Sequence, residues 1–183
     1  MKSKKWTLLA TSLTAMVLMA ACAQSTTTSN TNATTNSATT TATKTNQSSY
    51  FTEKDNDTSY DESTASKIEL SGSSANVSGD GVTVSESTVT ITKSGTYVIS
   101  GQSDGVQIKV EADKSADVHL VLKGATMTNT NAAISATSAG HVYLTLAEGT
   151  TNSLSDSSSN SDEKADAALF SKVDLTINGK GTL

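Results

Sequence analysis

Proline and arginine are both absent from this chain of 183 residues, and aromatic residues make up only 4% of it. So few aromatic rings exclude a core built around them, and we expect a core of aliphatic side chains. The single cysteine, Cys22, cannot form an intramolecular disulfide, so the folded part must be stable without one. The formal net charge of -5 and the lack of basic patches argue against nucleic-acid binding.

The N-terminus has the pattern of a bacterial secretory signal. Lysines at positions 2, 4 and 5 precede an apolar run, 6–20, that is too short for a standard membrane span. Small residues then lead to Cys22, as in a lipoprotein signal, although Met19 stands where leucine is more usual. The pattern predicts a signal peptide over 1–21 and a diacylglycerol on Cys22, which would anchor the protein to the outer side of the cytoplasmic membrane, at the cell surface. The alternative is a plain secretory signal in which Cys22 has no role.

Residues 22–66 are predicted to be a disordered tether. Residues 23–49 are almost entirely Ser, Thr, Asn and Ala, which bury too little apolar surface to offset the entropy lost on ordering. In the acidic patch that follows, Asp55 and Asp57 half match a calcium loop of the EF-hand kind, but Tyr60 stands where glycine is needed. We therefore expect a solvated acidic linker at this patch.

From residue 67 the chain has the pattern of strands, because short runs of Val, Ile, Leu and Thr alternate with Gly, Asn, Asp and Ser. Three of these runs nearly repeat one another: VHLVLKG, VYLTLAEG and VDLTING. Strand side chains alternate between faces, so the apolar positions of the repeats should share one face. The predicted inward columns are Val89, Leu120, Leu144 and Leu175; Ile91, Leu122, Leu146 and Ile177; and Val118, Val142 and Val173.

Each repeat continues with a second short segment (TYVIS, ATMT, TNSL or GTL) and a third, at 106–110, 132–136 and 167–171. Three short strands in a period of roughly 24 to 31 residues are typical of the coils of a solenoid, whose stacked copies share one core. The predicted fold is therefore an all-β parallel β-helix over 67–183, with about three coils and the start of a fourth. The chain stops in an apolar strand, so we expect it to be truncated or its last edge to be covered by a partner. The alternative fold is a β-sandwich.

Four segments carry a resemblance to a known family: SGTYVISGQSDGVQIKVEA, VHLVLKGATMTNTNAAISA, VYLTLAEGTTNSLSD and AALFSKVDLTINGKGTL. They resemble bacterial cell-surface carbohydrate-binding domains that are similar in fold to pectate lyases, and the resemblance covers 68–183. It implies a right-handed parallel β-helix, calcium binding, and affinity for cellulose or acidic pectic chains without established cleavage. The family's further coils, rich in Gly-Asp-Gly, have no counterpart here, so its calcium ligands are not carried over.

Two sets of side chains are candidates for binding. His119, Tyr143 and Asp174 are predicted to share an outward column on adjacent coils, where an aromatic ring and polar groups could dock a sugar chain; the alternative is an ordinary solvated sheet face. The second set surrounds a polar insertion that lengthens the third coil and is predicted to be a surface loop. Carboxylates there could hold calcium, or simply be solvated. They are Asp156, Asp162, Glu163 and Asp166.

The sequence thus predicts a surface-anchored, noncatalytic lipoprotein that binds a polysaccharide with the help of calcium. One alternative is a structural or adhesive surface protein. A second is a polysaccharide lyase, but pectate-lyase-like enzymes typically use arginine as the base, and this chain has none.

Overall fold

The alternation of apolar and polar residues produces strands along the computed structural model, which describes residues 50–157 and 164–183. Cys22 and the predicted signal peptide lie outside the described residues, as do Asp162 and Glu163. None of the described helices has the length and hydropathy needed to cross a membrane. The described elements are η1 (Lys54–Asn56), β1 (Ser66–Gly72), β2 (Ser74–Ser78), β3 (Val82–Ser85), β4 (Thr88–Ile91), β5 (Gly95–Asp104), β6 (Gln107–Glu111), β7 (Asp117–Thr128), β8 (Ile134–Ser138), β9 (His141–Leu146), β10 (Ser153–Ser155), β11 (Leu169–Ser171) and β12 (Asp174–Gly179).

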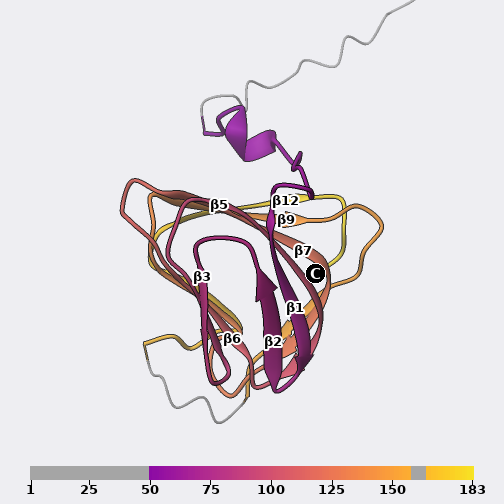
Figure 1. Ribbon diagram of the computed structural model, residues 1–183. Helices are drawn as coiled ribbons and strands as arrows, with labels where there is room; N and C mark the ends of the chain where they lie inside the picture. The colour runs from indigo at the N-terminus through magenta and orange to yellow at the C-terminus, as the bar shows by residue number, and fades with distance from the viewer. Residues whose placement is uncertain (1–49, 158–163) are drawn as a thin grey trace, which may run out of the picture. The chain divides into compact units, whose positions relative to one another are not determined.

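The strands form two sheets (Figure 1). The larger sheet has the order β12-β9-β7-β5-β1-β2, with β10 paired to the end of β7, and the smaller sheet has the order β11-β8-β6-β4-β3. From β4 to β9 successive strands alternate between the two sheets, and each pairs in parallel with the next strand of its own sheet. The antiparallel pairs are β1–β2 and β3–β4, at the N-terminal end of each sheet. The protein is therefore all-β, with mixed sheets.

Part of the predicted register is confirmed. Leu120 lies opposite Leu144 in the larger sheet. In the smaller sheet Ile108 lies opposite Ile134, and Ile134 opposite Leu169, so the third segments of the repeats pair as expected.

Two of the predicted alignments are wrong. Val89 belongs to β4 in the smaller sheet, and the residue beside Leu120 on its N-terminal side is Tyr97, from the TYVIS run that was predicted to be a second segment. The last repeat is shifted by two residues, because Leu175 lies opposite Val142, the position predicted for Val173. A shift of two keeps every side chain on its face, so the apolar pattern is the same in both registers.

The core lies between the two sheets and consists of aliphatic side chains with one tyrosine, as the low aromatic content predicts. Tyr97 is 1% exposed, and its hydroxyl donates to the carbonyl oxygen of Lys93 at 2.8 Å. Burying one aliphatic side chain of this core stabilises the fold by roughly 1.5–3 kcal/mol. Core residues with no exposed surface include Ile68, Ile99, Leu120, Leu122 and Leu144 from the larger sheet and Val89, Ile91, Ile108, Val110 and Ile134 from the smaller one.

Residues 52–65, called the strap below, differ from the expected linker. Tyr60 and Ala65 pack against Val98 and Val121, which lie on the outer face of the larger sheet. Val121 has no exposed surface even though its neighbours in sequence point into the core. The strap therefore covers a face of the sheet that the sequence predicts to be solvated, and it belongs to the folded unit.

Candidate functional site

The three residues predicted to form a sugar-binding column do not all lie in one column. His119 and Tyr143 are opposite each other in β7 and β9. Asp174, however, pairs with His141, and the position next to Tyr143 is taken by Thr176. The two-residue shift of β12 explains the difference. Asp174 is exposed on the sheet.

Tyr143 is not an open stacking platform, since it is only 8% exposed. The His141 ring stacks on it with a centroid distance of 4.2 Å and an interplanar angle of 10°. The Nζ atom of Lys54, from the strap, lies 4.9 Å from the centroid of the same ring. The chain's own side chains therefore occupy the surroundings of this ring that a sugar would need.

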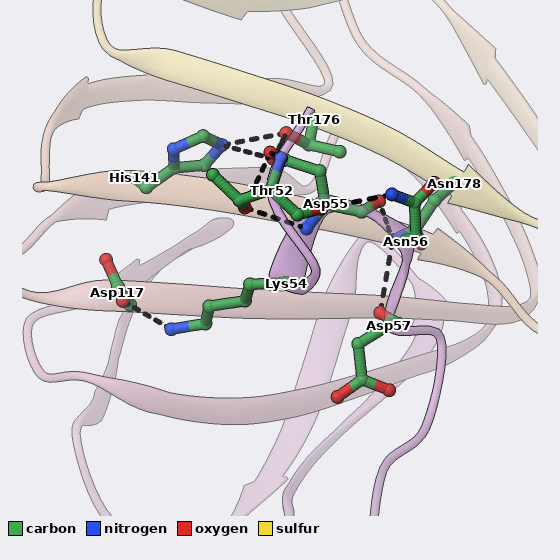
Figure 2. A network of polar contacts seen from close by, with 9 residues as sticks. All are labelled: Thr52, Lys54, Asp55, Asn56, Asp57, Asp117, His141, Thr176 and Asn178. Carbon is green, nitrogen blue, oxygen red and sulfur yellow. Dashed lines mark hydrogen bonds and ion pairs between the residues drawn. The ribbon is translucent and has the colours of Figure 1, made fainter. Parts of the chain in front are cut away.

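Asp55 is the centre of the contacts between the strap and β12 (Figure 2). Its Oδ1 accepts the hydroxyl proton of Thr176 at 2.6 Å, and its Oδ2 accepts from the backbone N–H and the hydroxyl of Thr52 at 2.7 and 2.8 Å. These bonds hold the pKa of Asp55 at about 2, well below its usual 3.8, and the bond from Thr176 has the largest effect. The carboxylate is thus ionised and ordered, with a side chain that is 9% exposed.

The side chain of Asn178 binds the backbone of the strap. Its Nδ2 donates to the carbonyl oxygens of Asp55 and Asp57, at 3.1 and 3.2 Å (Figure 2). Two ion pairs add to these bonds, Lys54 with Asp117 and Lys123 with Glu62. All four charged side chains of these pairs are about half exposed, so each pair contributes little to stability, of the order of 0–1 kcal/mol.

The two histidines of the chain connect to this network through threonines. The Nε2 atom of His119 lies 2.7 Å from the hydroxyl of Thr145, which donates to Oδ1 of Asn178 at 2.6 Å. The Nε2 atom of His141 lies 2.8 Å from the hydroxyl of Thr176. Burial lowers the pKa of His119, against a smaller raising effect of Asp57. His119 is therefore neutral at pH 7.

The strap borders a hollow of about 200 Å³ on the outer face of the larger sheet, called the His119 hollow below. Its lining combines an ammonium, two carboxylates, an imidazole and three hydroxyls, groups that can bind the hydroxyls of a sugar by donating and accepting hydrogen bonds. A second hollow, of about 380 Å³, lies beside Tyr60 and Lys123. The His119 hollow is lined by Lys54, Asp57, Ser59, Gly95, Thr96, Asp117, His119 and Tyr143.

The predicted calcium ligands are only partly within view. Asp156 and Asp166 are described, while Asp162 and Glu163 are not. In the described ranges no three acidic, histidine or cysteine side chains are grouped so as to hold a metal ion. Calcium binding stays a prediction.

Sequence reasoning found His119 and Tyr143 but missed the strap residues that surround them. Lys54 contacts Asp117 across 63 positions and Thr176 contacts Asp55 across 121. Such contacts have no period or spacing in the sequence. A local signal did exist, because Asp57 and Asp61 each accept from the backbone and hydroxyl of a serine two residues later, which marks an ordered turn.

Comparison with known proteins gives three findings. A family described as "Carbohydrate-binding domain-containing protein" matches residues 85–183. A protein of that description from Acetivibrio thermocellus is 38% identical over 97 residues, which is 50% of this chain and 34% of that protein. The solved structure of the polysaccharide lyase-like protein from C. thermocellum, a gadolinium derivative, is similar with a TM-score of 0.59 and 38% identity, over 64% of this chain and 50% of that one. The chain thus spans about a third of the curated relative and half of the solved structure, and the family match begins after the strap.

Proposed function

The chain belongs to the family of carbohydrate-binding domain-containing proteins, and on this premise we propose that it is a noncatalytic polysaccharide binder. The observation that carries the proposal is the His119 hollow, a concave site on a sheet face with hydrogen-bond donors and acceptors close together. Sites for small ligands are usually concave, with a few convergent polar groups. A polysaccharide would lie along the outer face of the larger sheet, with one sugar residue in this hollow.

The finer architecture that we propose is a right-handed parallel β-helix. In support, β5, β7 and β9 pair in parallel in one sheet while β4, β6 and β8 do so in the other, and the chain passes from sheet to sheet between them. Each passage through both sheets would be one coil.

We further propose a cellulosic or acidic pectic ligand and display at the cell surface through the diacylglycerol on Cys22. The hollow contains Asp57 and Asp117 but one lysine, Lys54. Because an acidic chain would meet like charge there, its binding would need a cation, and calcium fits that role. Calcium thus assists the binding of an acidic chain in this proposal.

A polysaccharide lyase is the second candidate, favoured by the description of the solved relative as polysaccharide lyase-like. The hollow supplies a lysine rather than an arginine, and Lys54 already pairs with Asp117. We therefore place this activity second, and an adhesive role without a sugar ligand third.

The test is retention of the 183-residue chain on insoluble cellulose and on immobilised polygalacturonate, each in calcium and in chelator. Thr96→Val removes one hydroxyl from the hollow and should weaken retention, whereas Thr90→Val, on the smaller sheet, should not. Absorbance of unsaturated products in the same samples tests the lyase. Retention without product supports the binder, and product formation supports the lyase. If the chain is neither retained nor forms product, the adhesive role remains.

A further inference from the structure

The carbonyl oxygens of the strap fix the orientation of the Asn178 side chain. A carbonyl oxygen only accepts, so the atom of Asn178 that faces the carbonyls of Asp55 and Asp57 must be its amide nitrogen. The amide oxygen of Asn178 therefore faces Thr145. This settles an orientation that is otherwise ambiguous for an asparagine.

The orientation of Asn178 in turn fixes the proton on His119. Thr145 has one hydroxyl proton, and it donates that proton to Oδ1 of Asn178 at 2.6 Å. Toward His119 the hydroxyl can then only accept, so Nε2 of His119 must carry a proton. In the neutral ring the other nitrogen, Nδ1, is consequently unprotonated and is a hydrogen-bond acceptor.

Two acceptor atoms of residues that line the hollow have no protein partner in the part of the chain that the structure describes. Among the described residues Nδ1 of His119 has no hydrogen-bond partner, and neither has Oδ2 of Asp57, whose Oδ1 accepts from Ser59. Each of these groups shifts the pKa of the other electrostatically, as neighbours do. Lys54, the cation of the hollow, is held by Asp117. The ligand group that fits this part of the hollow must supply protons.

We propose that Asp57 of the strap and Nδ1 of His119 form a pair of acceptors that binds the hydroxyl groups of a neutral sugar residue, and that the strap sets the His119 tautomer through Asn178 and Thr145. The inference rests on the proposed function and names the residues that select its ligand. Hydroxyls donate to both acceptors, whereas the carboxylate of a uronic acid cannot donate and would be repelled by Asp57. Since the strap precedes the family match at 85–183, the selectivity comes from a segment that the match does not include.

Nitrogen NMR of the chain labelled with ¹⁵N-histidine tests the tautomer. The two histidines give two sets of signals, and His141→Gln assigns them. At pH 7.5 we expect the His119 Nε2 signal in the protonated range and the Nδ1 signal in the unprotonated range. Thr145→Val should leave the ring as a mixture of tautomers, and Thr145→Ser, which keeps the hydroxyl, should restore the single form. The reverse tautomer in the wild type would overturn the claim that the strap sets the His119 tautomer through Asn178 and Thr145.

Binding to a soluble neutral β-glucan, in chelator, tests the acceptor pair. Asp57→Asn removes the charge and should weaken binding about tenfold or more, as expected when a hydrogen bond to a charged group is lost. The matched control is Asp61→Asn, since Asp61 makes the same turn with Ser63, at 2.9 and 2.6 Å, but does not line the hollow. The control should bind within about twofold of the wild type.

The outcomes separate this inference from the proposed function. If the wild type binds and Asp57→Asn binds equally well, the acceptor pair is wrong while the polysaccharide binder stands. If polygalacturonate binds the wild type in chelator more tightly than the β-glucan does, the selectivity is wrong. If the wild type binds no polysaccharide, the proposed function fails, and the role of Asp57 in recognition fails with it even where NMR shows the expected tautomer.

Discussion

Thr176 in β12 donates its hydroxyl proton to the carboxylate of Asp55, 121 positions earlier in the chain, at 2.6 Å. The same hydroxyl lies 2.8 Å from Nε2 of His141. Because the proton of Thr176 is used on Asp55, His141 must be the donor to Thr176. One threonine thus joins the strap, the last strand and β9, and it lies at the position where the sequence alignment places Asp174.

Replacing Thr176 with valine should raise the pKa of Asp55. The hydrogen bond from Thr176 is the first cause of its value of about 2, and Thr52 would still donate to it, so we expect a value between about 2 and the usual 3.8. A carbon-detected NMR titration of the aspartate carboxyls measures this. Thr83→Val, at an exposed position on β3, is the control and should leave Asp55 unchanged. A pKa still near 2 in Thr176→Val would show that this bond does not hold the carboxylate.

Asn178→Ala should loosen the strap without unfolding the sheets. The substitution removes two donors to strap carbonyls and an acceptor for Thr145, each bond being worth about 0.5–1.5 kcal/mol. We expect faster hydrogen exchange in the strap and unchanged exchange in β6 and β8. Lys180→Ala, at an exposed neighbouring position, should leave the strap protected. Equal protection of the strap in both variants would contradict its attachment through Asn178.

Stability should fall as the pH decreases through about 6.5, the ordinary pKa of histidine. Burial lowers the pKa of His119 in the folded chain, so below 6.5 the unfolded chain binds a proton that the folded chain does not. The free energy of unfolding therefore decreases from pH 6.5 down to the folded pKa and then levels off. The strap aspartates Asp55, Asp57 and Asp61 have lowered pKa values in the folded chain, so the stability that they contribute is lost only below about pH 5.

Denaturant unfolding between pH 8 and pH 5 measures this slope. His119→Gln keeps an N–H that can donate to Thr145 but cannot be protonated, so it should flatten the profile. Both proteins contain His141, so the difference between their slopes reports on position 119. An identical slope in the variant would show that His119 is not the group responsible.

The apolar pattern predicted which residues fill the core but not how the last strand is aligned. Val173, Leu175 and Ile177 alternate regularly, so any shift by two residues buries an equally apolar set. What distinguishes the observed register is polar, since Thr176 and Asn178 reach the strap only when Leu175 lies opposite Val142. The strap itself has the composition of a solvated linker. The bonds that attach it to the sheet reach residues between 61 and 123 positions away, and no local pattern predicts such contacts.

Leu144 and Ile177 occupy the same register column, and the structure predicts opposite results for their substitution by alanine. Leu144 has no exposed surface and packs in the core, whereas Ile177, on the last described strand of the larger sheet, is 51% exposed. Leu144→Ala removes buried methyl groups and leaves a cavity, which should reduce the free energy of unfolding by about 2–5 kcal/mol. Ile177→Ala leaves no cavity and should cost less than about 1 kcal/mol. Urea denaturation compares the free energies of unfolding of the two variants directly if the free energy depends on urea concentration with the same slope in both. Equal losses would mean that the column is buried along its whole length, for example because chains associate through β12 in solution, and the dependence of the Ile177→Ala result on protein concentration would show it.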